Sequence, residues 1–314
     1  MIILLIVGAA LILVGGIVAG AAVLMFRGNF ESFSTGKEAS ETYRPEGEFT
    51  SIEVNVQHAV TFAPASDGKC LVEYKGEERG EREVKVENGK LVIKETIEDS
   101  SFFNFYFKES LFTVYLPKSE YENLSFTGTT GKLKMPKDFS FEKATVTVTT
   151  GDVTFDASVS GALAVTGGTG DFHADGAEFG ELNVVLTTGD QKISSVKVGG
   201  GVSVKASTGK IRMNALTCPS LKIRLTTGDV ELTDVIADGR MEVETSTGDV
   251  RLKRCDAADI DITVTTGKVS GTLRSAKTFD AHASTGKVDV PANGGTGTCK
   301  VRASTGNVKL EIEE

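Results

Sequence analysis

Cysteine and histidine, two residues that often carry chemistry in proteins, are few and scattered in this chain of 314 residues. The four cysteines lack the C-x-x-C spacing of zinc and redox motifs; they are Cys70, Cys218, Cys255 and Cys299. We predict buried thiols, and a Cys218–Cys255 disulfide stays open for a domain outside the cytoplasm. The three histidines lie far apart, at His58, His173 and His282. This spacing favours no metal site.

Polar residues, all but one of them charged, recur directly after a Thr-Gly step. They are Lys132, Asp152, Asp171, Asp190, Lys210, Asp229, Asp249, Lys268, Lys287 and Asn307. Stacked aspartates could bind calcium, but the glycine-rich nonapeptide loop of calcium-binding repeats is absent and lysines interrupt the column. We therefore interpret these residues as turn residues, and we expect no metal and no cofactor.

The composition argues against two classes of function. A net charge of −9 disfavours a nucleic-acid partner, because phosphate binding needs a concentrated basic surface. A β-helix enzyme acting on polysaccharides would need clustered carboxylates in an aromatic-lined groove. No such cluster departs from the repeat, and tryptophan is absent. We predict no catalytic residues.

The residues that follow the Thr-Gly steps belong to an internal repeat with the sequence pattern Ser/Thr-Thr-Gly-Asp/Lys-apolar. Its glycines follow one another at intervals of 19 or 20 residues; they are Gly131, Gly151, Gly170, Gly189, Gly209, Gly228, Gly248, Gly267, Gly286 and Gly306. A unit of this length cannot bury a core alone, so identical units must stack.

Apolar residues stand at every second position before each glycine, as in the strand 221–228. Two more follow the glycine, such as Val230 and Leu232. These positions predict inward columns of two parallel strands and a looser third side in each coil. The fold class is therefore all-β: a parallel β-helix, or β-solenoid, of about ten coils over residues 128–314, with right-handed winding as the default. Charges of opposite sign on neighbouring coils, such as Lys222 and Glu242, predict structural ion pairs.

The glycine must allow a sharp turn, which predicts a positive φ. Strand alternation places the preceding threonine inward, so we predict a buried threonine ladder. Its members are Thr130, Thr150, Thr169, Thr188, Thr208, Thr227, Thr247, Thr266, Thr285 and Thr305. The alternative is an exposed threonine array that binds ice or sugar. The predicted alternation disfavours it.

Residues 1–26 carry no charged side chain and are long enough for a helix across the roughly 30 Å hydrocarbon layer. We predict a retained transmembrane anchor rather than a cleaved signal peptide, because a basic n-region is missing. Arg27 on the C-terminal flank would, by the positive-inside rule, keep the domain in the cytoplasm. Residues 27–47 are predicted to be a polar tether.

Residues 48–127 keep the alternation of a β-rich segment but lose the glycine period, as terminal, capping units of solenoids do. This segment contains an apolar run, Phe102, Phe103, Phe105, Tyr106 and Phe107. We interpret the run as a cover for the first coil. Contact with a partner or a membrane surface is the alternative, because exposed aromatic clusters often mark interaction sites.

The chain resembles a bacterial β-strand repeat family of adhesin-like proteins, a domain of unknown function. The resemblance rests on the N-terminal anchor, on Phe49-x-x-Ile52-x-Val54, on Val114-Tyr115-Leu116-Pro117 and on the Thr-Gly repeats. It implies a single-pass protein of the bacterial cell membrane with the solenoid outside the cytoplasm. It brings no catalytic residues.

These observations favour a non-enzymatic adhesin-like or scaffold module that contacts a cell-wall polymer or an envelope protein. The alternative is an accessory protein of envelope-stress signalling. Self-polymerisation through open coil ends is disfavoured by the acidic C-terminus at 311–314, which would protect an edge.

Overall fold

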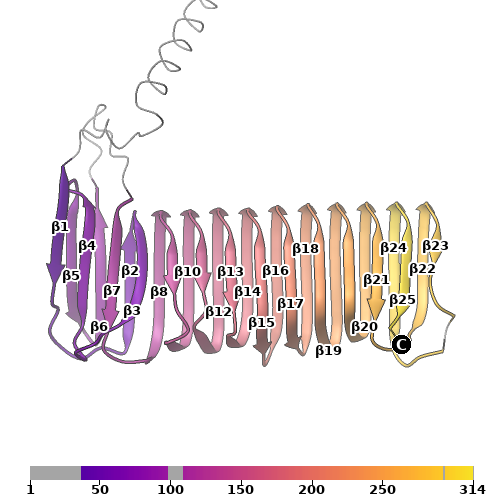
Figure 1. The fold of residues 1–314 in the computed structure, drawn as a ribbon, viewed down its shortest axis with the longest axis horizontal. Helices are drawn as coiled ribbons and strands as arrows, with labels where there is room; N and C mark the ends of the chain where they lie inside the picture. Colours follow the sequence, from indigo (N-terminus) through magenta and orange to yellow (C-terminus); the bar gives the residue numbers. More distant parts are fainter. Residues whose placement is uncertain (1–36, 98–108, 293, 314) are drawn as a thin grey trace, which may run out of the picture.

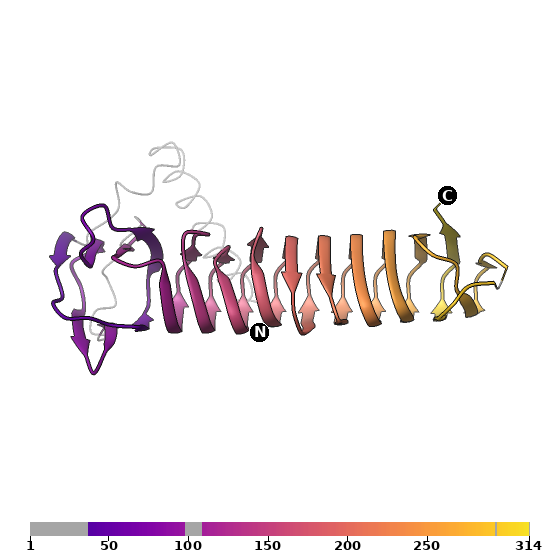
Figure 2. The same cartoon turned by 90° about the horizontal axis from the view of Figure 1, so that it is seen from below.

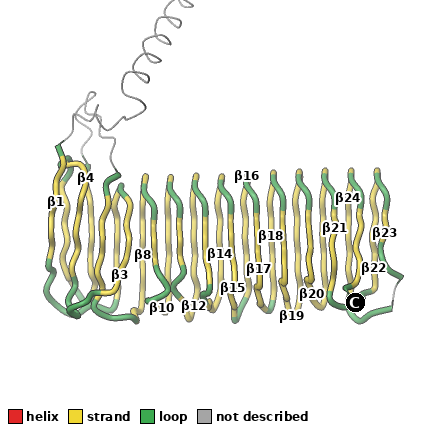
Figure 3. Tube along the Cα trace, viewed as in Figure 1, coloured by secondary structure: helices red, strands yellow, loops and turns green. Residues whose placement is uncertain are grey.

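The computed structural model describes residues 37–97, 109–292 and 294–313. These residues form a long β-solenoid in which strands from successive coils stack side by side along a rod (Figure 1). The prediction of an all-β parallel solenoid is confirmed, with about nine turns where ten coils were expected. Figure 3 shows strands joined by turns along both long edges of the rod.

One side of the rod consists of strands that run towards the repeated glycines, and we call it the pre-glycine sheet. In spatial order it contains β5 (Glu81–Glu87), β6 (Lys90–Thr96), β2 (Ser51–Val56), β8 (Glu120–Thr130), β10 (Ser140–Thr150), β12 (Ser158–Thr169), β14 (Glu178–Thr188), β16 (Gly201–Thr208), β18 (Ser220–Thr227), the ends of β19 (Val230–Thr247) and β20 (Val250–Thr266), β24 (Thr298–Thr305) and β22 (Thr278–Thr285).

The strands that leave the glycines form the second side, the post-glycine sheet. Its order is β1 (Glu38–Tyr43), β4 (Leu71–Glu77), β7 (Leu111–Leu116), β3 (Ala59–Pro64), β9 (Leu133–Met135), β11 (Val153–Phe155), β13 (Phe172–Asp175), β15 (Gln191–Val198), β17 (Ile211–Cys218), the starts of β19 and β20, β21 (Val269–Leu273), β25 (Val308–Ile312) and β23 (Val288–Asp289). Both sheets are parallel except at the N-terminal end.

A second corner opens the third side of several coils. Ser195, Ala215, Asp234 and Arg254 have φ between 52° and 54°, six residues after the repeated glycine. After this corner two further side chains per coil point inward, such as Leu216 and Cys218, which are buried. Figure 2 shows this side of the rod from below. The third side is therefore real, although it is shorter than the pre-glycine strands.

The core is one continuous column of side chains along the whole rod. The register pairs Leu221 with Met241 and Ile223 with Val243, and all four are at most 1% exposed. Burial of aliphatic columns is the main stabilising contribution to such a stack, at about 25 cal/mol per Å² of apolar surface.

The N-terminal part extends the stack beyond the repeat. Strands β2 and β3 form a coil that turns at Gln57 and His58, where later coils have Thr-Gly, and Thr130 donates its backbone N–H to the Gln57 carbonyl. β6 and β7 form one more coil next to it. Three antiparallel strands, β5, β4 and β1, then close this end. Because β1 begins at residue 38, the predicted tether of residues 27–47 is too long.

The C-terminal coils are out of sequence order. β24 pairs with β20 on one side and with β22 on the other, so the last repeat in the chain is the penultimate coil in space. The glycines agree, because Gly306 lies against Gly267 and Gly286 lies against Gly306. The expectation that the acidic C-terminus protects the end of the stack is therefore wrong, since β25 lies inside it.

The predicted anchor, residues 1–26, lies outside the described residues. Across the described ranges the secondary structure contains strands, turns and loops, and no helix there is long and apolar enough to span a bilayer.

Candidate functional site

The repeated glycines form one column along an edge of the rod. Nine of the ten, all except Gly131, have φ between 137° and 149°, as a turn that favours glycine requires. The backbones also touch: a Cβ at Gly151 would lie 1.9 Å from the Gly131 carbonyl oxygen, and the same contact recurs in later coils. Eight of the ten glycine nitrogens, all except those of Gly131 and Gly286, instead donate to a threonine carbonyl of the next coil, such as Gly151 to Thr169 at 2.8 Å.

The threonines before these glycines point outward, and the prediction of a buried threonine ladder is wrong. Inward alternation ends three residues before the glycine, because the stacked glycine backbones leave no interior space at the corner. The residue before each threonine is exposed as well, except at Gly168. We call the resulting double column of exposed hydroxyls the hydroxyl edge: Thr129, Thr130, Thr149, Thr150, Thr169, Thr187, Thr188, Ser207, Thr208, Thr226, Thr227, Ser246, Thr247, Thr265, Thr266, Ser284, Thr285, Ser304 and Thr305.

The hydroxyls of this edge are almost all available to a ligand. Among the described residues only the Thr130 hydroxyl donates a hydrogen bond, to the Gln57 carbonyl at 2.9 Å. The backbone beneath is satisfied by the coil-to-coil bonds, so the edge is rigid. A Ser or Thr hydroxyl can both donate and accept, which suits hydroxyl-bearing ligands.

The residues after the glycines are turn residues. The aspartates among them stabilise the turn, because their side chains accept backbone hydrogen bonds. Asp152 Oδ1 accepts the backbone N–H of Asp171 at 3.0 Å, and Asp190 Oδ1 accepts that of Lys210 at 2.8 Å. Among the described residues, no group of three or more His, Cys, Asp or Glu side chains could hold a metal ion.

Ion pairs join neighbouring coils on the outer faces. Lys222 Nζ lies 2.7 Å from Glu242 Oε1, and Arg212 Nε lies 3.3 Å from Glu231 Oε2. The sequence predicted ion pairs of this kind, with Lys222 and Glu242 as its example. They are partly exposed, so each contributes at most about 1 kcal/mol.

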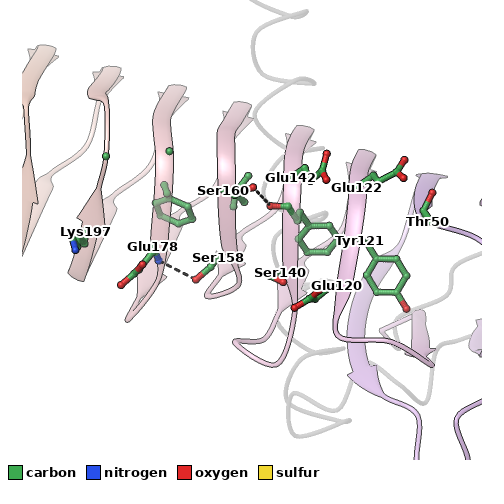
Figure 4. Close-up of a pocket in the computed structure, with 15 residues that line it drawn as sticks. Thr50, Glu120, Tyr121, Glu122, Ser140, Glu142, Ser158, Ser160, Glu178 and Lys197 are labelled. Carbon is green, nitrogen blue, oxygen red and sulfur yellow. Dashed lines mark hydrogen bonds between the residues drawn. The ribbon is translucent and has the colours of Figure 1, made fainter.

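A groove of about 620 Å³ runs across β8, β10, β12 and β14, on the side away from the hydroxyl edge. It opens where the register shifts between Phe141 and Ala144 and again between Val159 and Ala162. Figure 4 shows two rows of polar side chains along it: Glu120, Ser140, Ser158 and Glu178 in one row, Glu122, Glu142 and Ser160 in the other.

The floor of this groove is aromatic but closed. Tyr121 stacks on Phe49 with ring centroids 5.7 Å apart, and on Phe141 at 6.0 Å. Tyr121 and Phe141 are at most 4% exposed, so their faces cannot receive a sugar ring. The four glutamates are all exposed and their carboxylates hydrogen-bond to no other described residue. A general acid and base pair needs two carboxylates in different environments, which this groove does not provide.

Sequence reasoning missed this groove. The signal was an apolar column about ten residues before each glycine, where Tyr121, Phe141, Val159 and Phe179 share one register position. It also missed a buried ion cluster at the first turn. There the Glu95 carboxylate, whose side chain is 0% exposed, lies 2.9 Å from His58 Nδ1 and 3.2 Å from Arg82 Nε.

This cluster is embedded in the N-terminal closure. The Arg82 guanidinium lies 3.6 Å from the centroid of the Tyr74 ring and also contacts Glu41 at 2.9 Å. Burial opposes the charge on Glu95, but hydrogen bonds from His58 and the Gln57 N–H, with the charge of Arg82, outweigh it and lower the pKa of Glu95. The cluster is a structural element that fixes the first turn.

The four cysteines, all within the described part of the chain, are buried thiols without a disulfide. Burial raises the pKa of Cys70, Cys218 and Cys299 to about 12, so these thiols are poor nucleophiles at neutral pH. The prediction of buried thiols is confirmed, and the Cys218–Cys255 bridge is absent.

The aromatic run, Phe102, Phe103, Phe105, Tyr106 and Phe107, lies outside the described residues. Its C-terminal flank is described: Glu109 lines a small cavity with His58, Thr130 and Gly131. Glu109, shortly before β7, therefore lies at the same edge of the rod as the Thr-Gly turns.

Comparisons with known proteins place the chain in a family. No curated protein matches it. A provisionally named adhesin of Parabacteroides distasonis is 10% identical, with 88% of this chain and 98% of that chain covered, at a TM-score of 0.52. A second, from Bacteroides fragilis, is 14% identical over 88% and 97% of the two chains, at 0.42. The first likeness shows a shared fold. The model of the Toastrack DUF4097 family matches residues 49–233 and 200–314, and the chain belongs to this family.

Proposed function

We propose that this protein is a non-enzymatic, adhesin-like module of the bacterial cell envelope that binds a neutral polysaccharide along the hydroxyl edge. The observation that carries the proposal is the double column of exposed Ser and Thr hydroxyls, which hydrogen-bond to almost nothing in the described chain. The provisional adhesin name of the Parabacteroides distasonis relative is consistent with it.

Regular spacing favours a polymer over a small molecule. Neighbouring coils place equivalent hydroxyls about 4.8 Å apart, the distance between hydrogen-bonded strands. A chain of sugars offers hydroxyl groups at regular intervals and can contact many coils at once. Each contact is weak, but the edge is already ordered, so binding loses little conformational entropy.

Charge decides which polymer fits. The protein has a net charge of −9, and aspartates such as Asp171 and Asp190 flank the hydroxyl edge directly. A polyanionic wall polymer would be repelled by this surface. A neutral polysaccharide forms its hydrogen bonds without that cost.

Localisation is part of the proposal. Residues 1–26 would anchor the chain in the cell membrane as a single span, with the solenoid outside the cytoplasm. β1 begins at the end of the rod where Glu38 pairs with Glu77, beside the first turns, so the anchor would join at the hydroxyl edge. Protease treatment of intact cells tests this: digestion of the solenoid supports it, and full protection contradicts it.

Cosedimentation of the full chain with purified cell-wall sacculi that carry neutral polysaccharide tests the binding. The variant replaces Thr188, Thr208, Thr227 and Thr247 by Val, which removes hydroxyls at nearly constant volume. Its matched control changes four exposed hydroxyls on the outer face of the pre-glycine sheet: Thr145→Val, Thr147→Val, Ser203→Ala and Thr263→Val. We expect the edge variant to lose affinity about tenfold or more and the control to keep it. Equal binding by both variants would contradict the proposal.

A further inference from the structure

The two ends of the solenoid differ in their outermost strands. At the N-terminal end the outermost strands are β5 and β1, which run antiparallel to their neighbours and carry outward charges such as Glu81, Glu83 and Glu87. Charged edge strands of this kind discourage pairing with another sheet.

At the C-terminal end the stack stops at β22 and β23. β22 pairs only with β24, and β23 pairs with β25 in the post-glycine sheet. The outer edge of β22 therefore has no strand neighbour within the described residues. The chain could have covered this end with its final segment, but that segment, β24 and β25, is inserted one coil inside the stack.

Apolar surface is open at this end. Val288 is 42% exposed, one of two large apolar side chains that are exposed in the described chain. Ala281 and Ala283 point inward but are only half-buried, whereas Val301 and Ala303, at the same positions one coil inside, are buried. The end coil thus leaves the last layer of the core uncovered.

We propose that a second copy of this chain covers this end, with the β22 strands of the two copies pairing antiparallel about a two-fold axis at Ala281. A two-fold contact uses the same patch on both copies and closes after two. If both copies keep the same face of β22 inward, the two-fold axis must pass beside one residue of β22 and not between two residues. The side chains that then face each other across the axis select that residue.

Three registers place inward residues against inward residues near the middle of β22. An axis at Asp280 sets two aspartates directly opposite, and an axis at His282 sets two histidines opposite. With the axis at Ala281, Asp280 lies opposite His282 of the second copy, and Thr278 lies opposite Ser284. Opposite charges across a strand pair stabilise it, and like charges destabilise it.

A hydrogen bond from the neighbouring strand holds the Asp280 carboxylate in place for this contact. The Arg302 guanidinium of the neighbouring strand hydrogen-bonds to one carboxylate oxygen, Oδ2, and also donates to the Asp280 carbonyl at 2.6 Å. The hydrogen bond from Arg302 lowers the pKa of Asp280 and keeps it ionised. Its second oxygen remains to accept a hydrogen bond from the facing histidine.

Repulsion between like charges also disfavours head-to-tail polymerisation. It would bring Asp280 on β22 of one copy against β5 of the next, where three glutamates surround one lysine. The contact would also offer no apolar partner equal to Val288. The C-terminal end therefore fits its own copy better than it fits the other end.

Antiparallel pairing has a geometric consequence. Because the strand direction reverses across the axis, the hydroxyl edges of the two copies face opposite directions. A dimer of this kind suits a link between two opposing surfaces. Its two hydroxyl edges are not oriented to bind the same surface. The contact is only one coil wide, so we expect weak, concentration-dependent association.

Sedimentation velocity of the full chain in mild detergent, over about 1 to 100 µM, tests the dimer without any ligand, so its outcome is independent of the polysaccharide proposal. We expect monomer and dimer and no larger species. Ala281→Lys and Val288→Glu should each lower the association constant about tenfold or more. Ala39→Lys on β1, an equivalent change at the other end, should leave it unchanged. Val288 is exposed, so its replacement tests the contact even if the lysine variant fails to fold.

Disulfide trapping tests the register. Ala281→Cys should give a covalent dimer on mild oxidation, because the two residues face each other across the axis. Lys85→Cys on β5 is the control and should not. The proposal would be overturned if the chain stayed monomeric, or if Ala281→Lys, Val288→Glu and Ala39→Lys all left the association unchanged. Equal effects of Ala281→Lys and Ala39→Lys would overturn it as well.

Discussion

Asp171 accepts a hydrogen bond from the backbone nitrogen of Asp190, one coil further along, with its Oδ1 2.7 Å from that nitrogen. No backbone acceptor is available at this point of the turn. Gly189 donates to the Thr208 carbonyl and Gln191 donates to the Lys210 carbonyl, so the N–H between them must find a side chain. The aspartate column therefore continues the coil-to-coil hydrogen bonding through the turn.

Asp171→Ala should lower the free energy of unfolding by about 1 kcal/mol, because a backbone donor loses its partner. Asp171→Asn should retain most of the stability, since the amide oxygen can accept the same bond. Urea unfolding followed by circular dichroism measures both. If Asn is as harmful as Ala, the charge rather than the hydrogen bond matters.

Gln191→Leu should stabilise the protein. Gln191 is 0% exposed in a core column, paired with Phe172 and Ile211, and neither its Nε2 nor its Oε1 has a hydrogen-bond partner among the described residues. An unsatisfied buried polar group costs about 1–3 kcal/mol, and leucine fills the same column. Thermal unfolding should show a higher melting temperature for Gln191→Leu than for Gln191→Ala, which removes the amide but leaves a cavity. A lower melting temperature for the leucine variant than for the wild type would show that the amide is satisfied in solution.

Gly209→Ala should be among the most damaging single changes. Gly209 has φ of 140°, and a Cβ there would lie 2.1 Å from the Gly189 carbonyl oxygen, a backbone atom that cannot move aside. We expect a loss above about 4 kcal/mol, or failure to fold. Gly176→Ala is the control: φ is 71°, but no atom lies within 4 Å, so only the left-handed conformation is penalised, by about 1–2 kcal/mol. Soluble yield and unfolding midpoint distinguish the two, and similar losses would mean that φ alone sets the cost.

Glu95→Gln should change how stability depends on pH. The pKa of Glu95 is lowered in the folded state, so the carboxylate contributes stability above its unfolded pKa of about 4.3, and this contribution is lost as pH falls through the folded pKa. Wild type should be more stable than Glu95→Gln by about 1–3 kcal/mol at pH 7, and the difference should shrink in acid. Glu78→Gln, at an exposed site, should behave as wild type. A difference independent of pH would mean that Glu95 acts by packing alone.

The fold could be predicted from a few residues because they repeat. Leu221 and Ile223 recur as apolar residues in coil after coil, and a short unit with such columns can bury them only by stacking in parallel. The burial of Cys299 and the pairing of Lys222 with Glu242 follow from the same register. The family resemblance rests on the same repeats.

The tertiary structure decided the features that depend on where one coil meets another. Thr208 is exposed because alternation holds within a strand but ends at the corner, where the glycine backbones are in contact. Gly306 lies between Gly267 and Gly286 because near-identical coils accept one another in any order, so the repeat carries no information about the sequence of stacking. Because of that exchange β22, rather than the last pre-glycine strand of the sequence, has the uncovered edge on which the dimer depends.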